Sequence, residues 1–371
     1  MKIAFIIGTR PELIKVAPVI WTLKKKEIDF DVVNTAQHKD LLDPYWETFN
    51  IQPTHVLDVM VEGQSLSSLT SRAINQIQEY VDSAIVKPTI ILAQGDTTTV
   101  MAASMVSFYN QIKFAHLEAG LRSFDFENPF PEEYNRKIAS IAADYHLCPT
   151  NISCENLLNE KIPKKKIFEV GNTVVDALSE IKGNANFLSL PWKNKDLNKI
   201  NDFEKVVLVT CHRRENHGKN LLEIIDTINQ LAEQNVNMIF IWTLHPNPNV
   251  KNSVKNSNLS TKNNVLLIDP LEYIDILKLL SIAYCAISDS GGIQEEAPSF
   301  GTPVLVLRKA TERPEGVSSG VAFLVGSTKS EIIHRFNELE HNYPSFAGNP
   351  YGDGKSSERI FDILTNKKIK A

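Results

Sequence analysis

Short apolar runs alternate with longer amphipathic segments in two successive series along this chain of 371 residues. The apolar runs have the length of strands, and the segments between them have the spacing of helices. Strands that alternate with helices form parallel sheets with helices on both faces. We therefore predict an α/β chain of two Rossmann-like domains that face each other across a cleft. The predicted strands are at residues 3–7, 31–35, 89–93 and 113–117 in the first series and at 206–210, 237–242, 264–268, 283–288 and 303–307 in the second.

A polar stretch at residues 182–202, rich in Asn and Lys, separates the two series. A pause of this kind indicates a passage between domains. We place an N-terminal domain at residues 1–172 and a C-terminal domain at residues 173–352. We expect the last helix, at about 353–371, to pack back on the N-terminal domain.

The charge balance excludes some classes of function. Lys and Arg number 39 and Asp and Glu number 44, which gives a formal net charge of −5. General binders of nucleic acids or anionic membranes carry a basic excess, so we expect neither partner. No apolar run approaches the ~20 residues of a membrane-spanning helix, and the four cysteines form no CxxC pair. We expect a reduced, cytoplasmic protein with neither a metal nor a redox cofactor.

Two cations stand at the start of the first predicted helix. Arg10 follows the first strand directly, and Lys15 comes a turn later. The helix dipole disfavours cations at this end, but an anion held by the free N–H groups would resolve the conflict. The sequence therefore favours an anion site here. The alternative is that both side chains are solvated surface charges.

Three carboxylates follow strands or begin helices in the first series. Asp96 ends a strand, although it could be only an N-cap. Glu118 lies two residues after His116, so both side chains share one face of a strand end. Glu132 begins a helix, where an i,i+4 pair with Arg136 would be purely structural. Because chemistry collects beyond the carboxyl ends of parallel strands, we treat all three as candidates.

The second series carries two charged clusters at strand ends. His212 and Arg213 belong to a dense group of charges after the strand at 206–210. A Ser-Gly-Gly sequence then opens a helix after the strand at 283–288, and bare N–H groups there suit a phosphate. Glu296, one turn later, could accept from ribose hydroxyls. Together with a later arginine these groups predict a pocket for a nucleoside diphosphate, which comprises Ser290, Gly291, Gly292, Glu296 and Arg313.

Nine motifs resemble the non-hydrolysing bacterial UDP-N-acetylglucosamine 2-epimerase family. The resemblance extends from residue 8 to about 360, and the motifs occur in order with natural spacing. They are GTRPELIK, TAQH, QGDTTT, HLEAGLRS, PFPEEYNR, TCHRREN, SDSGGIQEEAPSFGTPVLVLR, TERPEGV and NPYGDGKSSERI.

The resemblance implies a fold, a reaction and a partner. The family has the two-domain fold of GT-B glycosyltransferases. It interconverts UDP-N-acetylglucosamine and UDP-N-acetylmannosamine through elimination and re-addition of UDP, with 2-acetamidoglucal as the intermediate. The product supplies ManNAc for surface polysaccharide. We expect a homodimer that takes a UDP-sugar as substrate and needs no cofactor.

The resemblance also assigns roles to residues. Asp96, Glu118 and Glu132 match the catalytic carboxylates, and His212 matches an essential histidine. Gln37 and His38 match a possible allosteric site for a second UDP-N-acetylglucosamine. Ile276 matches a position whose backbone meets uracil. The positions that match substrate-binding residues are Arg10, Lys15, Arg136, Arg213, Ile276, Ser290, Gly291, Gly292, Glu296 and Arg313.

Other functions remain open from the sequence. A 2-epimerase of a modified UDP-HexNAc sugar would carry the same motifs, because specificity depends on details of the pocket. A GT-B glycosyltransferase would share the fold and the UDP site but would need an acceptor groove. A hydrolysing epimerase would release free sugar, and a sensor would bind the nucleotide sugar without chemistry.

Overall fold

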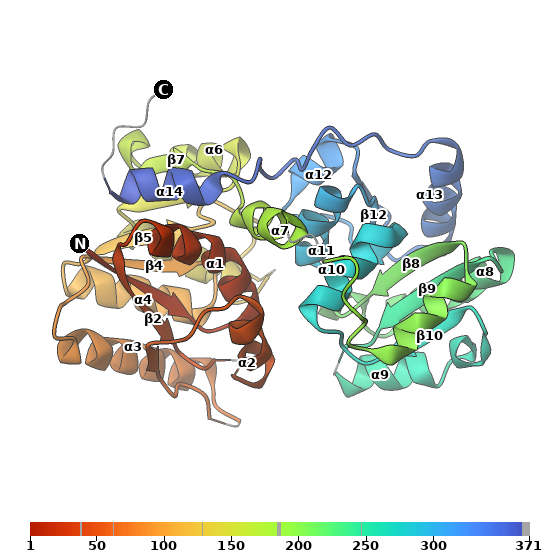
Figure 1. Ribbon diagram of the computed structural model, residues 1–371, viewed down its shortest axis with the longest axis horizontal. Helices are drawn as coiled ribbons and strands as arrows, with labels where there is room; N and C mark the ends of the chain where they lie inside the picture. Colours follow the sequence, from red (N-terminus) through yellow and green to blue (C-terminus); the bar gives the residue numbers. More distant parts are fainter. Residues whose placement is uncertain (38, 62, 128, 184–186, 246, 366–371) are drawn as a thin grey trace. The chain divides into compact units, whose positions relative to one another are not determined.

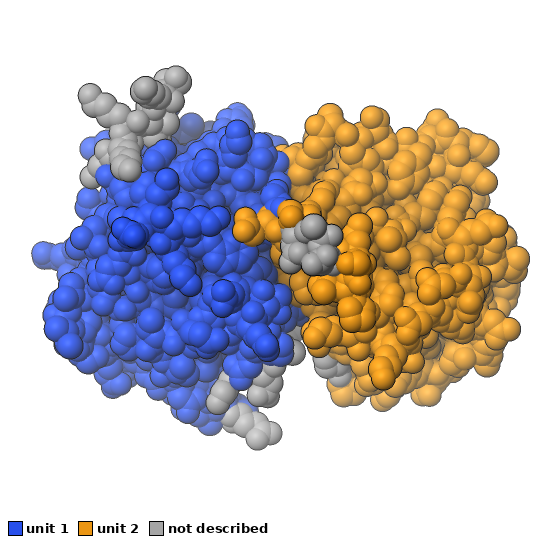
Figure 2. All heavy atoms as spheres, in the orientation of Figure 1, with its two compact units in different colours: residues 1–179, 351–371 blue, residues 180–350 orange. Residues whose placement is uncertain are grey.

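The computed structural model describes residues 1–371 except 38, 62, 128, 184–186, 246 and 366–371. The chain divides into two compact units (Figure 2). Unit 1 comprises residues 1–179 and 351–371, and unit 2 comprises residues 180–350. The first division falls within α7 (Thr173–Gly183), whereas the sequence analysis places the boundaries after residues 172 and 352.

Unit 1 contains a seven-stranded sheet in which every pairing between neighbouring strands is parallel. The strands follow the order β3-β2-β1-β4-β5-β6-β7 across the sheet. Their bounds are β1 (Lys2–Ile7), β2 (Asp29–Asn34), β3 (His55–Val56), β4 (Ile90–Gln94), β5 (Lys113–Leu117), β6 (Tyr145–Cys148) and β7 (Ile167–Glu169).

The helices of unit 1 lie between successive strands in the chain, with one helix added at the carboxyl end (Figure 1). The last helix, α14, packs against α1. The helices are α1 (Arg10–Lys25), α2 (Lys39–Thr48), α3 (Leu66–Ser83), α4 (Thr98–Tyr109), α5 (Glu132–Ala142), α6 (Asn151–Asn159), α7 and α14 (Ser356–Leu364).

Unit 2 repeats the plan with a six-stranded parallel sheet in the order β10-β9-β8-β11-β12-β13. Its strands are β8 (Lys205–Thr210), β9 (Met238–Thr243), β10 (Val265–Ile268), β11 (Ala283–Ser288), β12 (Val304–Val306) and β13 (Ala322–Leu324). Its helices are α8 (Lys219–Gln234), α9 (Pro248–Lys255), α10 (Tyr273–Ile282), α11 (Gly291–Glu296), α12 (Pro314–Ser318) and α13 (Lys329–His341).

Strand composition explains why these sheets form. In β1 every residue from Ile3 to Ile7 is fully buried, as expected where helices cover both faces of a parallel sheet. In unit 2, Trp242 and Phe240 of β9 are also fully buried and belong to a core that β8, β9 and α8 share. These observations confirm the predicted fold class, an α/β chain with two parallel sheets.

The chain order reverses once in each sheet, and this point is where ligands bind in open parallel sheets. In unit 1 the reversal occurs at β1, which pairs with both β2 and β4. In unit 2 it occurs at β8, which pairs with both β9 and β11. The turns after β1, β4, β8 and β11 are therefore the expected binding positions.

Among the described residues, the helices lack the combination of length and apolar character that a membrane crossing requires.

Candidate active site

In unit 1, the turn after β1 places one cation at the surface and one inside. Thr9 is the N-cap of α1, and Pro11 occupies its first turn, where its missing N–H does no harm. Arg10 is exposed, and its Nη1 donates to the Tyr45 hydroxyl at 3.4 Å. Lys15 is buried and forms an ion pair with Glu118, which follows β5. The structure thus brings together two residues that are 103 positions apart.

Glu118 adopts an unusual backbone conformation. Its φ is +65°, a region that residues other than glycine enter at a cost of about 1–3 kcal/mol. The Glu118 N–H donates to the Leu147 carbonyl at 3.0 Å, so β6 holds this turn in place. The conformation ends β5 and sets the direction in which the carboxylate that pairs with Lys15 leaves the sheet.

The turn before α4 contacts the N-terminal half of α5 at Asp96. Arg136 of α5 donates to Asp96 Oδ2 through Nε at 2.9 Å and forms an ion pair with the same oxygen through Nη2 at 2.6 Å. Asn135 Nδ2 donates to the Asp96 carbonyl at 2.8 Å. Glu132 is the first residue of α5 and is half-buried. The side chain of Asp96 therefore contacts the same helix whose first residue is Glu132.

The sheet register places the remaining carboxylate beside this contact. Gln94 is opposite Leu117 in the β4–β5 pair, and the Gly95 N–H donates to the Leu117 carbonyl at 3.0 Å. Asp96 follows Gly95, and Glu118 follows Leu117. The structure thus places Asp96 and Glu118 in unit 1 at the carboxyl ends of neighbouring strands, and Glu132 at the start of the helix whose Arg136 binds Asp96.

Glu133, which supports Asp96 through Arg136, is not among the residues predicted from the sequence. Glu133 is fully buried, and its Oε2 accepts from Arg136 Nη1 at 3.0 Å. Its carboxylate also accepts from the N–H groups of Ser123 and Phe124 at 3.1 and 3.3 Å. Two acidic residues in a first turn resemble an ordinary helix start, so the pattern gave no sign of this contact.

His116 has a role in the interior. It is fully buried, and its Nε2 lies 2.7 Å from the Gly95 carbonyl. Because a carbonyl can only accept, Nε2 carries the proton. Burial lowers the pKa of His116 to about 4, which makes the ring neutral at pH 7. Through its hydrogen bond to the Gly95 carbonyl, His116 stabilises the turn that precedes Asp96.

Gln37 also lies at this edge of the sheet. It is half-buried, and its Oε1 accepts from Thr99 Oγ1 at 2.7 Å. His38, its partner in the possible allosteric site, lies outside the described residues.

In unit 2, a buried carboxylate orients His212. Asp289 is fully buried and lies 3.0 Å from His212 Nδ1. It accepts from the N–H groups of His212 and Arg213 and from Asn216 Nδ2. Burial alone would raise the pKa of Asp289, but these donors outweigh it and hold the pKa well below its usual range. The sequence motif contains Asp289, but only the fold shows that it reaches the loop after β8.

Gly291 begins α11 and leaves space for Arg313. A Cβ at Gly291 would lie 2.7 Å from the Arg313 guanidinium carbon. Arg313 Nε donates to Glu295 at 2.7 Å, and its Nη1 lies 3.0 Å from Glu312. The predicted nucleotide residues Ser290, Gly291 and Arg313 are therefore neighbours, and Glu295 and Glu312 are additional residues that fix the guanidinium.

Glu312 also approaches two further arginines, Arg213 at 3.6 Å and Arg308 at 2.6 Å. Burial raises its pKa, but Arg313, Arg308 and Arg213 overcome this and hold the pKa far below its usual range. Arg308 also pairs with Glu215 at 2.9 Å, and Arg313 pairs with Glu295, so three carboxylates match these three guanidinium groups. The cluster fixes the arginines in place, and guanidinium N–H groups held in this way suit the recognition of an anionic ligand.

The remaining predicted residues of unit 2 lie in the first turn of α10 and along α11, which ends at Glu296. Glu296 accepts from the Tyr273 hydroxyl at 3.0 Å and lies 3.9 Å from the position of a Cβ on Gly292. Ile276 is half-buried in the first turn of α10. Tyr273 thus joins the predicted ribose and uracil positions.

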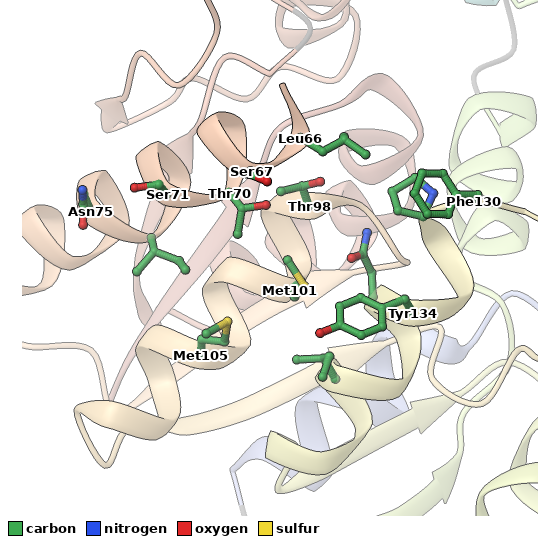
Figure 3. Close-up of a pocket in the computed structure, with 14 residues that line it drawn as sticks. Leu66, Ser67, Thr70, Ser71, Asn75, Thr98, Met101, Met105, Phe130 and Tyr134 are labelled. Atoms are coloured by element: carbon green, nitrogen blue, oxygen red, sulfur yellow. The ribbon is translucent and has the colours of Figure 1, made fainter. Parts of the chain in front are cut away.

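The described part of the chain contains no group of three or more His, Cys, Asp or Glu side chains that could hold a metal ion. A pocket of about 660 Å³ lies in unit 1 among α3, α4 and α5 (Figure 3). Met101, Met105 and Tyr134 line it, and its surface is mainly apolar. The candidate carboxylates are not among its lining residues.

Taken with the fold, these groups define the chain as a nucleotide-sugar enzyme with a GT-B-like α/β fold. The sequence profile of the family described as UDP-N-acetylglucosamine 2-epimerase matches residues 22–365. The chain belongs to the UDP-N-acetylglucosamine 2-epimerase family.

The similarity to individual members covers the whole chain. A UDP-N-acetylglucosamine 2-epimerase from Campylobacter jejuni is 42% identical over 99% of this chain and 98% of its own. A crystal structure of UDP-GlcNAc 2-epimerase from Neisseria meningitidis, bound to UDP-GlcNAc, matches with 41% identity and a TM-score of 0.90, covering 99% and 100% of the two chains. A crystal structure of UDP-GlcNAc 2-epimerase from Methanocaldococcus jannaschii, in complex with UDP-GlcNAc and UDP, matches with 35% identity and a TM-score of 0.84. The match covers 99% of this chain and 100% of that chain.

Proposed function

We propose that this protein is a non-hydrolysing 2-epimerase that interconverts UDP-N-acetylglucosamine and UDP-N-acetylmannosamine. The observation that carries the proposal is the placement of Asp96 and Glu118 at the ends of neighbouring strands of unit 1, with Lys15 on Glu118 and with Arg136, from the helix that Glu132 begins, on Asp96. The similarity to epimerases bound to UDP-GlcNAc supports the choice of substrate.

The chemistry explains why several carboxylates are needed. The C2–H bond of the sugar has no neighbouring carbonyl, so its proton is too weakly acidic for direct removal. Departure of UDP from C1 as the C2 proton leaves forms 2-acetamidoglucal, and a carboxylate is a sufficient base for that step. Return of the proton to the opposite face, followed by re-addition of UDP, inverts C2. Each face needs an acid–base group, which requires more than one carboxylate.

The departing diphosphate needs fixed positive charge and N–H donors. We propose that Ser290, Gly291, Gly292 and Arg313 bind it, that Glu296 binds the ribose, and that the backbone near Ile276 meets uracil. His212, oriented by Asp289, and Arg213 complete the groups in unit 2. Arg10, Lys15 and Arg136 are the proposed substrate-binding cations of unit 1.

The biological setting is part of the proposal. We propose that the product supplies ManNAc units for surface polysaccharide and that the protein acts in the cytoplasm as a homodimer. Its four cysteines are free and buried, which suits a reducing compartment. Gln37 and His38 are proposed as positions for a second UDP-N-acetylglucosamine.

Proton NMR of UDP-N-acetylglucosamine with the pure protein in deuterated water tests the function. We expect UDP-N-acetylmannosamine to accumulate to an equilibrium, with deuterium at C2 of both sugars. Irreversible release of free N-acetylmannosamine would indicate a hydrolysing enzyme instead. Release of UDP only after addition of an acceptor would indicate a glycosyltransferase, and binding without exchange at C2 would indicate a sensor.

A further inference from the structure

A buried carboxyl group that the proposed chemistry does not use lies between the two cations of α1. Glu12 is two residues after Arg10 and three before Lys15, yet only 1% of it is exposed. Its Oε2 accepts from the N–H groups of Gly8 and Thr9 at 2.6 and 3.2 Å. Glu12 therefore holds the backbone of the turn from which both cations project.

The other carboxylate oxygen reaches a second turn. Glu12 Oε1 accepts from Thr97 Oγ1 at 2.7 Å. Thr97 directly follows Asp96 and is the N-cap of α4, where its Oγ1 accepts from the Val100 N–H at 3.4 Å. A single side chain thus connects the turn after β1 to the turn after β4, and these strands are neighbours in the sheet.

The packing around Gly8 leaves these turns little freedom. A Cβ at Gly8 would lie 2.5 Å from Thr35 Oγ1 and 2.6 Å from Thr99 Oγ1. Those two hydroxyls are themselves 3.1 Å apart and hydrogen-bonded. Because Gly8 and Thr99 come from the turns that Glu12 connects, a shift of one turn displaces the other.

We propose that Glu12 is a positioning residue of the epimerase reaction, which fixes the turn bearing Arg10 and Lys15 against the turn bearing Asp96. The inference rests on the proposed function, because Asp96 and the two cations are its proposed reactive and binding groups. A displacement of about 1 Å in such groups can reduce turnover about 100-fold.

The contacts of Glu12 do not require a permanent negative charge. Burial raises the pKa of Glu12 to about 7, and the donors Gly8, Thr97 and Thr9 partly oppose this. In the two turns that it joins and in the first two turns of α1 and α4, the other ionisable side chains are Arg10, Lys15 and Asp96. A protonated carboxyl group can donate to Thr97 Oγ1 and still accept from the two N–H groups. A glutamine at this position can do the same.

The test compares disruptive and conservative variants at both ends of the connection. Glu12→Ala and Thr97→Val remove it, whereas Glu12→Gln and Thr97→Ser retain hydrogen-bonding groups. Glu79→Ala, in which an exposed carboxylate of α3 is removed, is the control for loss of a charge. For each variant, kcat and KM for UDP-N-acetylglucosamine are measured and expressed per UDP-binding site, so that unfolded protein is not counted.

We expect Glu12→Ala and Thr97→Val to lower kcat by about 10- to 100-fold and to raise KM, because the displaced turn bears two proposed substrate-binding cations, while the affinity for UDP, which we assign to unit 2, changes by less than about threefold. Glu12→Gln and Thr97→Ser should stay within about threefold of the wild type in kcat. If Glu12→Ala does not fold, Thr97→Val alone decides the question.

Two results would overturn the inference while the wild type epimerises normally. One is unchanged kcat per UDP site in the disruptive variants. The other is a Glu12→Gln variant as inactive as Glu12→Ala, which would mean that the carboxylate itself takes part in the chemistry. An inactive wild-type chain would refute the proposed function and this inference with it.

Discussion

Asp96 and Glu118 are each held by a cation from a different helix. Arg136 of α5 binds Asp96, and Lys15 of α1 binds Glu118. The two carboxylates therefore have different cation partners although they follow neighbouring strands. The proposed reaction needs acid–base groups on both faces of one carbon, and two carboxylates with different partners suit it.

Asp96→Asn and Glu118→Gln should each abolish exchange at C2 while UDP binding persists. An amide keeps the size of the carboxylate but cannot take up the C2 proton, and loss of an acid–base group typically costs about 10²- to 10⁴-fold in rate. Proton NMR in deuterated water measures the exchange, and calorimetric titration measures UDP binding. Retained turnover in both variants would remove these residues from the catalytic assignment.

The pKa of Glu12 predicts how stability depends on pH. Burial raises this pKa from 4.5 to about 7, so the protonated carboxyl group favours the folded state. The contribution is complete below about pH 4.5 and is lost as the pH rises through 7. Relative to Glu12→Gln, the wild type should lose about 3 kcal/mol of unfolding free energy between pH 4.5 and pH 8.5.

Denaturant unfolding of both proteins across this pH range provides the measurement. Other titrating groups are common to the two proteins and cancel in the difference. A difference in unfolding free energy that does not change with pH would contradict the raised pKa.

Sequence reasoning located the strand-end motifs but not the partners of their side chains. The positions of Asp96, Glu118 and His212 could be predicted because each follows an apolar run of strand length. The ion pair of Lys15 with Glu118 and the contact of Asp289 with His212 could not, because they depend on which strands are neighbours. The local sequence pattern predicts where strands occur, but it does not predict which strands are neighbours in a sheet.

At the scale of elements, the apolar runs predicted the central strands of both sheets and missed peripheral ones. β1, β4, β8 and β11 coincide with predicted strands to within one residue. β3 comprises only the exposed residues His55 and Val56, and the sequence analysis also omitted β6, β7 and β13. β3, β7 and β13 are short and only partly covered, so they carry little apolar pattern. β6 is mostly buried, but it has only four residues and His146 interrupts its apolar pattern.

The loop after β5 packs tightly on α6. Gly120 has a φ of +90°, and a Cβ there would lie 2.2 Å from the Ser153 carbonyl oxygen. Gly120→Ala should therefore destabilise unit 1 by about 2–4 kcal/mol, since backbone strain and overpacking add together. Denaturant unfolding measures the loss.

Gly63→Ala is the matched control, because Gly63 has a φ of +70° but nothing within 4 Å of a Cβ. The Gly63→Ala variant has the conformational strain without the steric clash, so we expect its unfolding free energy to fall by only about 1 kcal/mol. Equal losses in the two variants would show that the contact with α6 contributes nothing.

At the scale of the molecule, the chain leaves unit 1 through α7 and returns to it at residue 351. The return is fixed to α7 by hydrogen bonds in unit 1. The Asn172 N–H donates to the Tyr351 carbonyl at 2.8 Å. The buried Asp176 accepts from the N–H groups of Ser356 and Ser357 at 3.2 and 2.7 Å, which begin α14. The segment where the chain leaves unit 1 and the segment where it returns are thus joined at the Asp176 carboxylate.

Asp176→Ala should lower the unfolding free energy by about 2–3 kcal/mol, because it leaves two buried N–H donors unsatisfied at a helix start. Hydrogen exchange should rise in α14 and the first turns of α7, while UDP affinity, which we assign to unit 2, stays within about twofold. Asp353→Ala is the control, since its ion pair with Arg359 is exposed and should contribute less than about 1 kcal/mol. Equal effects of the two variants, or exchange that rises mainly in unit 2, would show that Asp176 does not fasten the returning chain.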